Sequence, residues 1–210
     1  SMQRVTDLTN AIDDIDRDFD ANHTGGIVLA PSSSGAVRLD ELTIADRCGR
    51  VLIDRADIRI EAGEKVMVSG ESGTGKSTLV RALAGLWPWG TGDIALPAGA
   101  SIAFVPERAY LPAGSLREAL LYPAQSASVD DAVLGESLAA AGLGYLVDRL
   151  GEAERWDHVL SNGERQRLAV ARLLVQKPDL VILDGATSAL DEEGEARLMR
   201  TLMAALDQST

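Results

Sequence analysis

The chain has 210 residues, 46% of them hydrophobic, which is enough for a substantial core in one large domain or in a domain with a subdomain. Its formal net charge is −12, and scattered Lys and Arg residues are outnumbered by Asp and Glu, which argues against a nucleic-acid partner. No apolar stretch is long enough to span a bilayer, no leader resembles a signal peptide, and the single cysteine, Cys48, excludes an internal disulfide, so we expect a polypeptide that is soluble by itself.

The first 36 residues differ in character from the rest. Val5 to Phe19 places apolar residues at helical spacing between aspartates, which predicts an acidic amphipathic helix. A glycine pair at 25–26 and a Pro- and Ser-rich run at 31–35 predict a flexible connection. Because the initial Ser-Met resembles an expression scar, we expect residues 1–36 to be a tag scar, a helix and a linker, in a chain that begins inside a longer protein.

A domain over 37–210 is predicted to combine strands and helices. Runs rich in Val and Ile predict strands at 37–44, 51–60, 65–68, 92–94 and 102–105, so we expect an antiparallel edge beside a parallel core. Residues 106–160 are instead helix-like and predict a helical insertion. Its candidate helices are 115–121, 130–141 and 144–150.

A glycine-rich segment, GESGTGKST from Gly70 to Thr78, fits the pattern G-x-x-x-x-G-K-[ST]. Its glycines let the backbone curl so that several N–H groups converge on phosphate oxygens, and it lies between a strand-like run and a helix-like stretch at 76–86. Lys76 would neutralise the β- and γ-phosphates, and Ser77 would offer its hydroxyl to Mg²⁺. The other residues expected to bind the nucleotide here are Gly70, Glu71, Ser72, Gly73, Thr74, Gly75 and Thr78.

The run LVILD, from Leu180 to Asp184, is continuously apolar up to its last residue. Such a run is typical of a central strand that is covered on both faces. Taken alone, Asp184 would most simply cap a turn. Together with the phosphate-binding segment, a carboxylate at the end of a parallel strand favours a contact with Mg²⁺ or its water shell.

The segment LSNGERQR, from Leu160 to Arg167, allows two interpretations. Ser161 followed by Glu164 is a capping box, which would start a helix with Leu168 and Ala171 on its apolar face. A helix start also binds anions, and Ser161 with Gly163 would suit a γ-phosphate brought by another molecule. The pattern alone does not choose between them.

In this order, the three segments and the following Ser188-Ala189-Leu190-Asp191 resemble the nucleotide-binding domain of an ATP-binding cassette transporter, from about Val37 to the end. The resemblance implies an α/β fold with a P-loop NTPase core of mainly parallel sheet, an antiparallel β edge and a helical subdomain at about 106–160. The stretches LWPWG at 86–90 and YLPAGSLREALLYP at 110–123 resemble half-transporters with a fused permease, akin to bacterial peptide or vitamin B12 transporters and peroxisomal fatty-acyl transporters.

The resemblance also implies a homodimer that sandwiches two ATP molecules. Each ATP, with Mg²⁺, would lie between Lys76, Ser77 and Asp184 of one subunit and Ser161, Gly163 and Glu164 of the other. Asp191 would lie across the dimer contact. Closure would pull on a membrane permease domain of the same polypeptide, at the cytoplasmic face of the membrane, and the acidic helix would be the connector.

Gly185 departs from the family pattern. The family usually carries Glu directly after the strand-ending Asp, where it polarises the attacking water. Because losing a positioned general base costs about 10² to 10⁴ in rate, we expect hydrolysis to be weak or absent while ATP binding persists. Either the site is naturally degenerate or the residue was changed to trap the ATP-bound dimer.

Glu107 and the histidines are further departures. Glu107 stands where relatives usually have a Gln that contacts Mg²⁺ and water, and its carboxylate would either replace that metal contact, repel the γ-phosphate or lie exposed at a strand end. The chain stops at Thr210, before the position expected for the family's switch histidine. His23 and His158 are expected to be surface residues.

The sequence contains few residues that indicate how adenine would be bound. Relatives stack the base on an aromatic residue before the second strand, but residues 45–50 contain none. Arg47 or Val51 would cover one face of the base. Trp87 and Trp89 are expected in the core or facing the permease.

The leading hypothesis is therefore an ATP-binding and ATP-hydrolysing transporter module, impaired in hydrolysis. One alternative is a nonhydrolysing module in which ATP only joins a dimer. Another is a soluble cassette ATPase of DNA repair or translation, against which the acidic charge and the connector-like helix argue. A small-molecule kinase is the weakest alternative because it leaves LSNGERQR without a chemical role.

Overall fold

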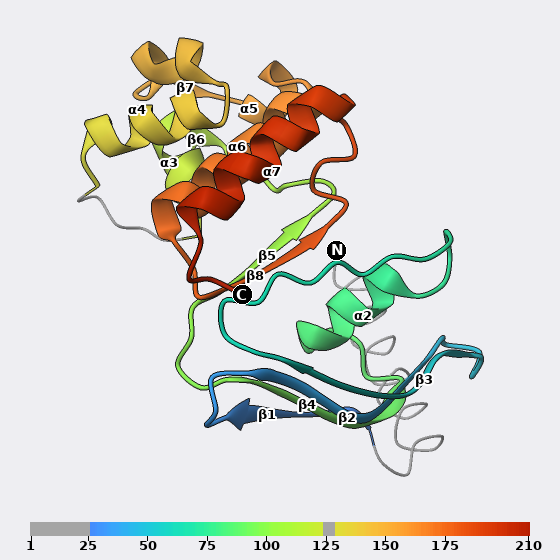
Figure 1. The fold of residues 1–210 in the computed structure, drawn as a ribbon. Coiled ribbons are helices and arrows are strands. Elements are labelled where there is room, and N and C mark those ends of the chain that lie inside the picture. Colours follow the sequence, from blue (N-terminus) through green and yellow to red (C-terminus); the bar gives the residue numbers. More distant parts are fainter. Residues whose placement is uncertain (1–25, 124–128) are drawn as a thin grey trace, which may run out of the picture. The chain divides into compact units, whose positions relative to one another are not determined.

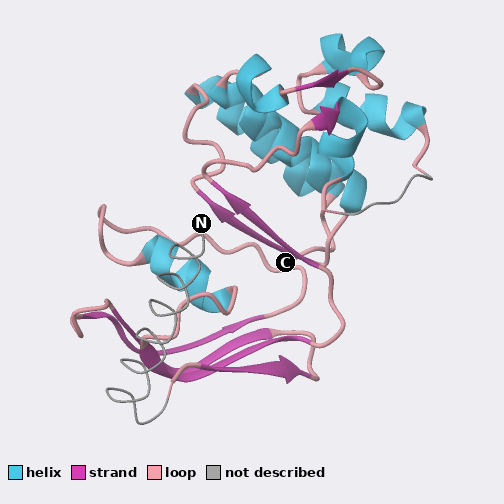
Figure 2. Ribbon diagram, turned by 180° about the vertical axis from the view of Figure 1, so that it is seen from behind, coloured by secondary structure: helices cyan, strands magenta, loops and turns pink. Residues whose placement is uncertain are grey.

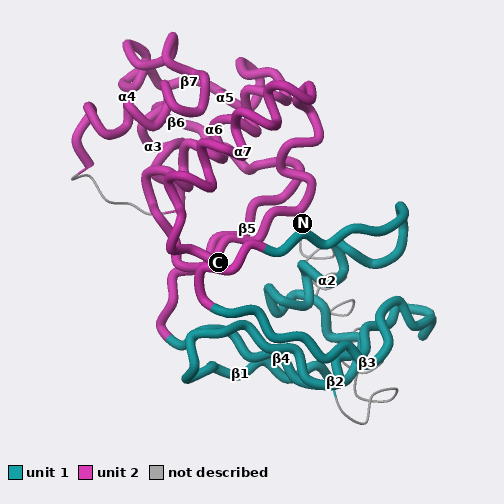
Figure 3. The backbone as a smooth tube through the Cα atoms, in the orientation of Figure 1, with its two compact units in different colours: residues 1–61, 66–98 teal, residues 62–65, 99–210 magenta. Residues whose placement is uncertain are grey.

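The computed structural model describes residues 26–123 and 129–210 (Figure 1). The predicted acidic helix at 5–19 lies outside these residues. The described chain forms two compact units, coloured separately in Figure 3. Unit 1 contains the described residues up to Glu61 together with Val66–Ala98, and unit 2 contains Ala62–Lys65 and Gly99–Thr210.

Unit 1 is a four-stranded sheet with one helix. Its elements are β1 (Val28–Ser32), β2 (Val37–Ala45), β3 (Val51–Ile60), α2 (Lys76–Leu83) and β4 (Gly90–Pro97). The strand order is β1-β4-β2-β3, in which β1 and β4 are parallel and β2 runs antiparallel to both β3 and β4. The predicted strands at 37–44, 51–60 and 92–94 are thus confirmed, and so is an antiparallel sheet.

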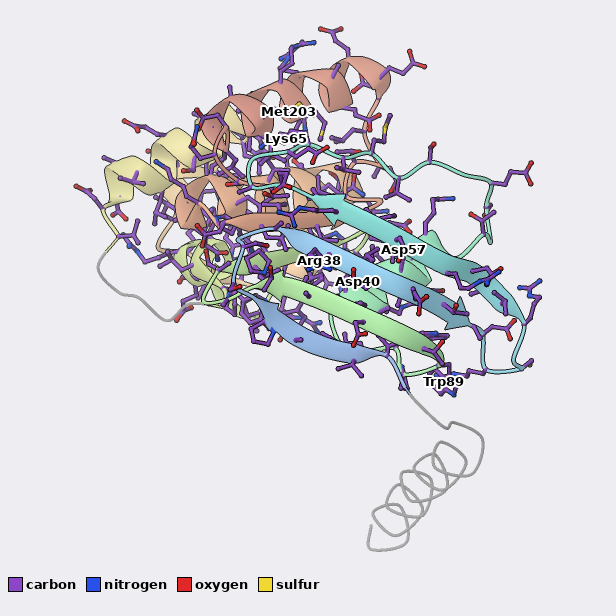
Figure 4. All side chains as sticks on the ribbon, turned by 60° about the horizontal axis from the view of Figure 1, so that its bottom comes forward. Arg38, Asp40, Asp57, Lys65, Trp89 and Met203 are labelled. Carbon is purple, nitrogen blue, oxygen red and sulfur yellow. The ribbon has the colours of Figure 1, made fainter. Side chains whose placement is uncertain are left out.

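The sheet of unit 1 has one apolar and one polar face because β2 alternates in character. Leu39, Leu42 and Ile44 are buried and cluster with Ala82 of α2. Arg38 lies on the polar face (Figure 4), where its guanidinium pairs with Asp40 at 2.8 Å. The apolar face therefore fixes α2, and with it the preceding segment, against the sheet.

Unit 2 combines a parallel strand pair with a helical region (Figure 2). The parallel pair is β5 (Ile102–Pro106) and β8 (Leu180–Asp184), which run in register from Ile102 with Leu180 to Pro106 with Asp184. The small antiparallel pair is β6 (Gly114–Ser115) and β7 (Ala153–Glu154). The helices are α3 (Leu116–Leu121), α4 (Asp131–Ala140), the 3-10 helix η1 (Gly144–Arg149), α5 (Trp156–Val159), α6 (Asn162–Gln176) and α7 (Glu192–Ala205).

Helix α6 is the centre of unit 2. Its residues 168–174 are all buried, and all of them except Arg172 cluster with fully buried side chains of the surrounding helices, among them Leu120, Leu134 and Trp156. Each such side chain contributes about 1.5–3 kcal/mol by leaving water. The predicted helices at 115–121 and 130–141 are confirmed, and the one at 144–150 forms as a 3-10 helix.

Three expectations need correction. Residues 65–68 do not form a strand: they have no ladder partner in the described chain, and Met67 is 89% exposed where the chain passes from unit 2 to unit 1. The predicted linker at 31–35 contains the end of β1, whose backbone pairs with β4. Residues 181–183 of β8 are only half-buried rather than covered on both faces.

The far edge of β8 is occupied by the last residue of the chain. The N–H of Val181 donates to the carbonyl of Thr210 at 2.8 Å, and the N–H of Thr210 donates to the carbonyl of Asp179 at 2.8 Å. Lys65 secures the same tail, since its Nζ donates to the carbonyls of Leu206 at 3.0 Å and of Ser209. Residues 206–210 are therefore an integral part of unit 2.

Candidate nucleotide-binding site

The glycine-rich segment forms a tight loop that leads directly into α2. Gly73 (φ 83°) and Gly75 (φ 99°) have left-handed backbones, which side chains rarely tolerate. A Cβ on Gly75 would also lie 3.0 Å from the Cβ of Leu52. Gly73 is therefore favoured by its backbone conformation alone, and Gly75 both by its backbone conformation and by the lack of space for a side chain.

Lys76 folds back over this loop. Its Nζ donates to the carbonyls of Gly70 at 2.6 Å and Glu71 at 2.7 Å, and Thr74 Oγ1 donates to the Glu71 carbonyl at 2.9 Å. The N-cap of α2 is Gly75, which has no capping side chain, and the first turn carries no acidic residue. The positive end of the helix dipole and a cation therefore stand together, and this donor set fits a phosphate chain.

The ends of β5 and β8 bring Glu107, Asp184 and Gly185 together. Pro106 pairs with Asp184 in register, so the residue after each strand lies beside the other. A Cβ on Gly185 would lie 3.5 Å from the Cβ of Glu107. Within the described residues, no three or more His, Cys, Asp or Glu side chains gather in a group that could hold a metal ion.

The predicted capping box at the start of α6 is confirmed. Ser161 Oγ accepts a hydrogen bond from the N–H of Glu164 at 3.3 Å, and Glu164 Oε2 accepts from the Ser161 N–H at 2.8 Å and hydroxyl at 2.6 Å. Gly163 lies close to the loop after β8, because a Cβ there would lie 3.3 Å from Leu190 Cδ2 and 3.4 Å from the Ala189 carbonyl oxygen. The helix start is thus held against the loop after β8.

Tyr145 of η1 makes a contact that sequence patterns did not predict. Its hydroxyl donates to Glu164 Oε1. The hydrogen bond from the Ser161 side chain and then that from Tyr145 lower the pKa of Glu164 below its ordinary value. Loss of solvent around the phenol and then the Glu164 hydrogen bond raise the pKa of Tyr145 to about 12. Glu164 is therefore held ionised beside Ser161.

An absorbance titration should reveal this contact. Because the pKa of Tyr145 is raised from 10.0 to about 12, the neutral phenol stabilises the folded chain fully below pH 10.0, and that contribution is lost as pH rises towards 12. Tyr145→Phe should remove the phenolate signal that develops last. Tyr110→Phe, away from this contact, should leave that late phase in place, and a late phase that survives Tyr145→Phe would refute the assignment.

Gln166 is the site residue that sequence reasoning missed. It is only 4% exposed, and its amide reaches Glu107, Gly185, Ser188 and Ala189. One signal could have found it, since Gln166 shares a helix face with buried Ala169, Val170 and Leu173. A polar residue on an apolar face must find hydrogen-bond partners in the fold.

The aromatic residues of unit 1 pack among themselves. Trp87 packs against the core, and its Nε1 donates to the Ala45 carbonyl at 2.9 Å. Trp89 meets Trp87 edge to face, and the guanidinium of Arg47 lies 5.0 Å from the centre of the Trp89 ring. Trp87 is therefore partly buried against the core, and Arg47 already has an aromatic partner on one face. In unit 2, His158 is exposed.

The predicted site residues are divided between the units. Gly70 to Thr78 belong to unit 1, whereas Glu107, the start of α6 and the end of β8 belong to unit 2. No helix in the described ranges combines the length and apolar character needed to cross a bilayer.

Comparison with known proteins gives a consistent family. The family model described as "ABC transporter" matches residues 53–188. An ABC transporter ATP-binding protein of Synechocystis sp. is 40% identical over 179 residues, which cover 83% of this chain and 27% of that protein. The lysosomal cobalamin transporter of Mus musculus is 34% identical over 222 residues (94% and 37%), and the ATP-binding cassette sub-family D member 3 of Homo sapiens is 35% identical over 179 residues (81% and 27%).

The chain spans between 27% and 37% of the length of these curated relatives. The matched span covers more than half of the chain and contains the glycine-rich loop, the start of α6 and Asp184. The match confirms the predicted α/β fold with a P-loop NTPase core. The chain therefore belongs to the ABC transporter family, as an ATP-binding module of that family.

Proposed function

We propose that this chain binds ATP with Mg²⁺ and that two copies close around two ATP molecules to drive movement of a substrate across a membrane. The observation that carries the proposal is the loop before α2, where Lys76 and an uncapped helix start form a ready site for a phosphate chain. The domain would be 37–210, with a helical subdomain at about 106–160. It would act at the cytoplasmic face of the membrane, joined to a permease domain in the full-length polypeptide.

The proposed roles follow from side-chain chemistry. Lys76 would neutralise the β- and γ-phosphates, and backbone N–H groups from Gly70 to Thr78 would hold their oxygens. Ser77 would offer Mg²⁺ its hydroxyl, and Asp184 and Glu107 would offer it their carboxylates. When bound, Mg²⁺ neutralises charge that develops on the phosphate oxygens.

The start of α6 would serve the ATP bound by the other copy. Ser161 Oγ and the backbone at Gly163 would approach the γ-phosphate, and Glu164 would hold the serine hydroxyl in place. Because Glu164 is ionised, it would also place negative charge near the phosphate. We infer that closure depends on Mg²⁺ to offset that charge.

Titration of the chain with Mg²⁺ and ATP, by calorimetry and sedimentation, tests this function. ATP should bind and produce a dimer. Ser161→Ala should weaken ATP-dependent dimerisation by about tenfold, since a hydrogen bond to a charged group is worth about 1.5–3 kcal/mol, and leave binding to the separate subunit unchanged.

Ser115→Ala is the matched control for that variant. Ser115 heads the same kind of capping box with Glu118 at the start of α3, so both variants lose a helix cap worth about 0.5–2 kcal/mol of stability. Only Ser161→Ala should affect dimerisation. Absence of ATP binding by the unaltered chain would refute the proposed function.

Gly185 favours a second candidate, a nonhydrolysing module in which ATP only joins the dimer. The residue after Asp184 has no side chain to polarise water, and its left-handed backbone (φ 64°) suits glycine. In either case we expect this chain to hydrolyse ATP weakly or not at all. Binding should persist because the loop before α2 is intact.

A further inference from the structure

We infer that Gln166 is a positioning residue that couples the start of α6 to the loops after β5 and β8. In the dimer it would link the ATP that a subunit holds itself to the ATP that it helps to enclose for its partner. This inference rests on the proposed function. It assigns a role to a side chain that touches neither nucleotide nor metal.

The contacts of Gln166 reach two loops, the one after β5 and the one between β8 and α7. Its Nε2 donates to the Glu107 carbonyl at 3.2 Å, to the Ser188 hydroxyl at 3.1 Å and, at 3.4 Å, to the Gly185 carbonyl. Its Oε1 accepts from the N–H of Ala189 at 2.9 Å. One amide therefore joins the ends of both strands and the segment that leads to α7.

Only an amide of this length meets these needs. The site presents carbonyl and hydroxyl oxygens on one side and an N–H on the other, so it requires donors and an acceptor in one side chain. A carboxylate would supply no donor, and an aliphatic side chain would leave all of these groups without this partner. Because Gln166 is 4% exposed, water is poorly placed to replace it.

The link from Gln166 to Ser161 runs along a rigid path. Ser161 is the N-cap of α6 and Gln166 lies in its second turn, and the start of the helix is fixed by the capping box with Glu164. Gly163 adds a second tie, since it packs closely against Leu190 in the same loop after β8. A shift of the helix start toward a partner's phosphate would therefore move the loop that carries Gly185, and the reverse would also hold.

Gln176 on the same helix provides a matched control. Its Nε2 donates to the Tyr122 carbonyl at 2.9 Å and to the Leu121 carbonyl at 3.4 Å, so it also joins α6 to another segment through its side-chain amide. These partners lie at the end of α3, not in the site loops. A general loss of packing on α6 should affect Gln166→Leu and Gln176→Leu alike, whereas coupling should affect only the first.

Hydrogen exchange in the absence of nucleotide tests whether Gln166 holds the loop after β8 in place. Gln166→Leu should speed exchange at the Ala189 amide and across residues 185–190, because that amide loses its acceptor. Gln176→Leu should leave this segment unchanged. Equal exchange in unaltered chain and Gln166→Leu would overturn the inference whatever the nucleotide results.

Titration with Mg²⁺ and ATP tests the coupling. Gln166→Leu should bind ATP as a separate subunit with unchanged affinity but dimerise about tenfold more weakly, the size typical of coupling between sites. Combined with Ser161→Ala, its effect should be less than additive, because both changes act through one helix start.

The outcomes separate this inference from the proposed function. If the unaltered chain forms no ATP-dependent dimer, the proposed function fails and the coupling fails with it. If the unaltered chain dimerises and Gln166→Leu dimerises equally well, only the coupling is overturned. Equal weakening by Gln176→Leu would also overturn it, as a sign of general destabilisation.

Discussion

Gly185→Glu should raise the rate of ATP hydrolysis by about 10²- to 10⁴-fold, the value of a correctly positioned general base. The new carboxylate would follow Asp184 at the end of β8 and lie beside Glu107. Affinity for ATP should change little, because Lys76 and the loop before α2 are unaltered. The measurement is phosphate release at saturating ATP, compared between Gly185→Glu and the unaltered chain.

The same substitution should lower stability. Gly185 has φ 64°, a conformation that costs other residues about 1–2 kcal/mol, so the melting temperature should fall by about 2–8 °C. Gly185→Ala carries the same backbone cost without a carboxylate and is therefore the control. If Gly185→Glu releases phosphate no faster than Gly185→Ala, the nonhydrolysing module is the better description of this chain.

Lys76→Met should weaken binding of ATP by at least about tenfold, since hydrogen bonds to charged groups are worth about 1.5–3 kcal/mol. Methionine keeps the length of the side chain but removes the cation that now spans the Gly70 and Glu71 carbonyls. Calorimetry gives the affinity. The rise in melting temperature on adding ATP gives an independent measure, because a ligand that binds only the folded chain stabilises it by an amount that increases with the logarithm of one plus the ratio of ATP concentration to Kd.

Arg81→Met is the control for that change. Arg81 is an exposed residue in the last turn of α2, so its replacement removes one positive charge from the same helix outside the loop. Its affinity for ATP should stay close to that of the unaltered chain. Similar losses in the two variants would mean that net charge, not the position of Lys76, governs binding.

Local patterns predicted the elements whose signals are contained in a few neighbouring residues. The capping box of Ser161 and Glu164 involves two residues three positions apart, and the β-type run that forms β2 lies within nine residues. The glycine-rich loop was predictable for the same reason. Its left-handed glycines are a property of the loop itself.

Contacts between distant segments were not predictable. Gln166 meets Glu107 across 59 positions, and Tyr145 reaches Glu164 from another helix. Neither pairing leaves a periodic trace in the sequence. The predicted strand at 65–68 fails for a related reason, because a β-type run forms a strand only when another backbone pairs with it, and the described residues provide no such partner.

The hydrogen bonds from Lys65 to the carbonyls of Leu206 and Ser209 have a consequence for the order of folding during synthesis. Lys65 Nζ meets the Leu206 carbonyl across 141 positions, so the contact cannot form until synthesis has passed residue 206 and that segment has left the ribosome. The sheet of unit 1 closes much earlier, since its last strand ends at Pro97. During synthesis, the sheet that supports the phosphate-binding loop is therefore complete before unit 2 can form the contact between Lys65 and residues 206–209.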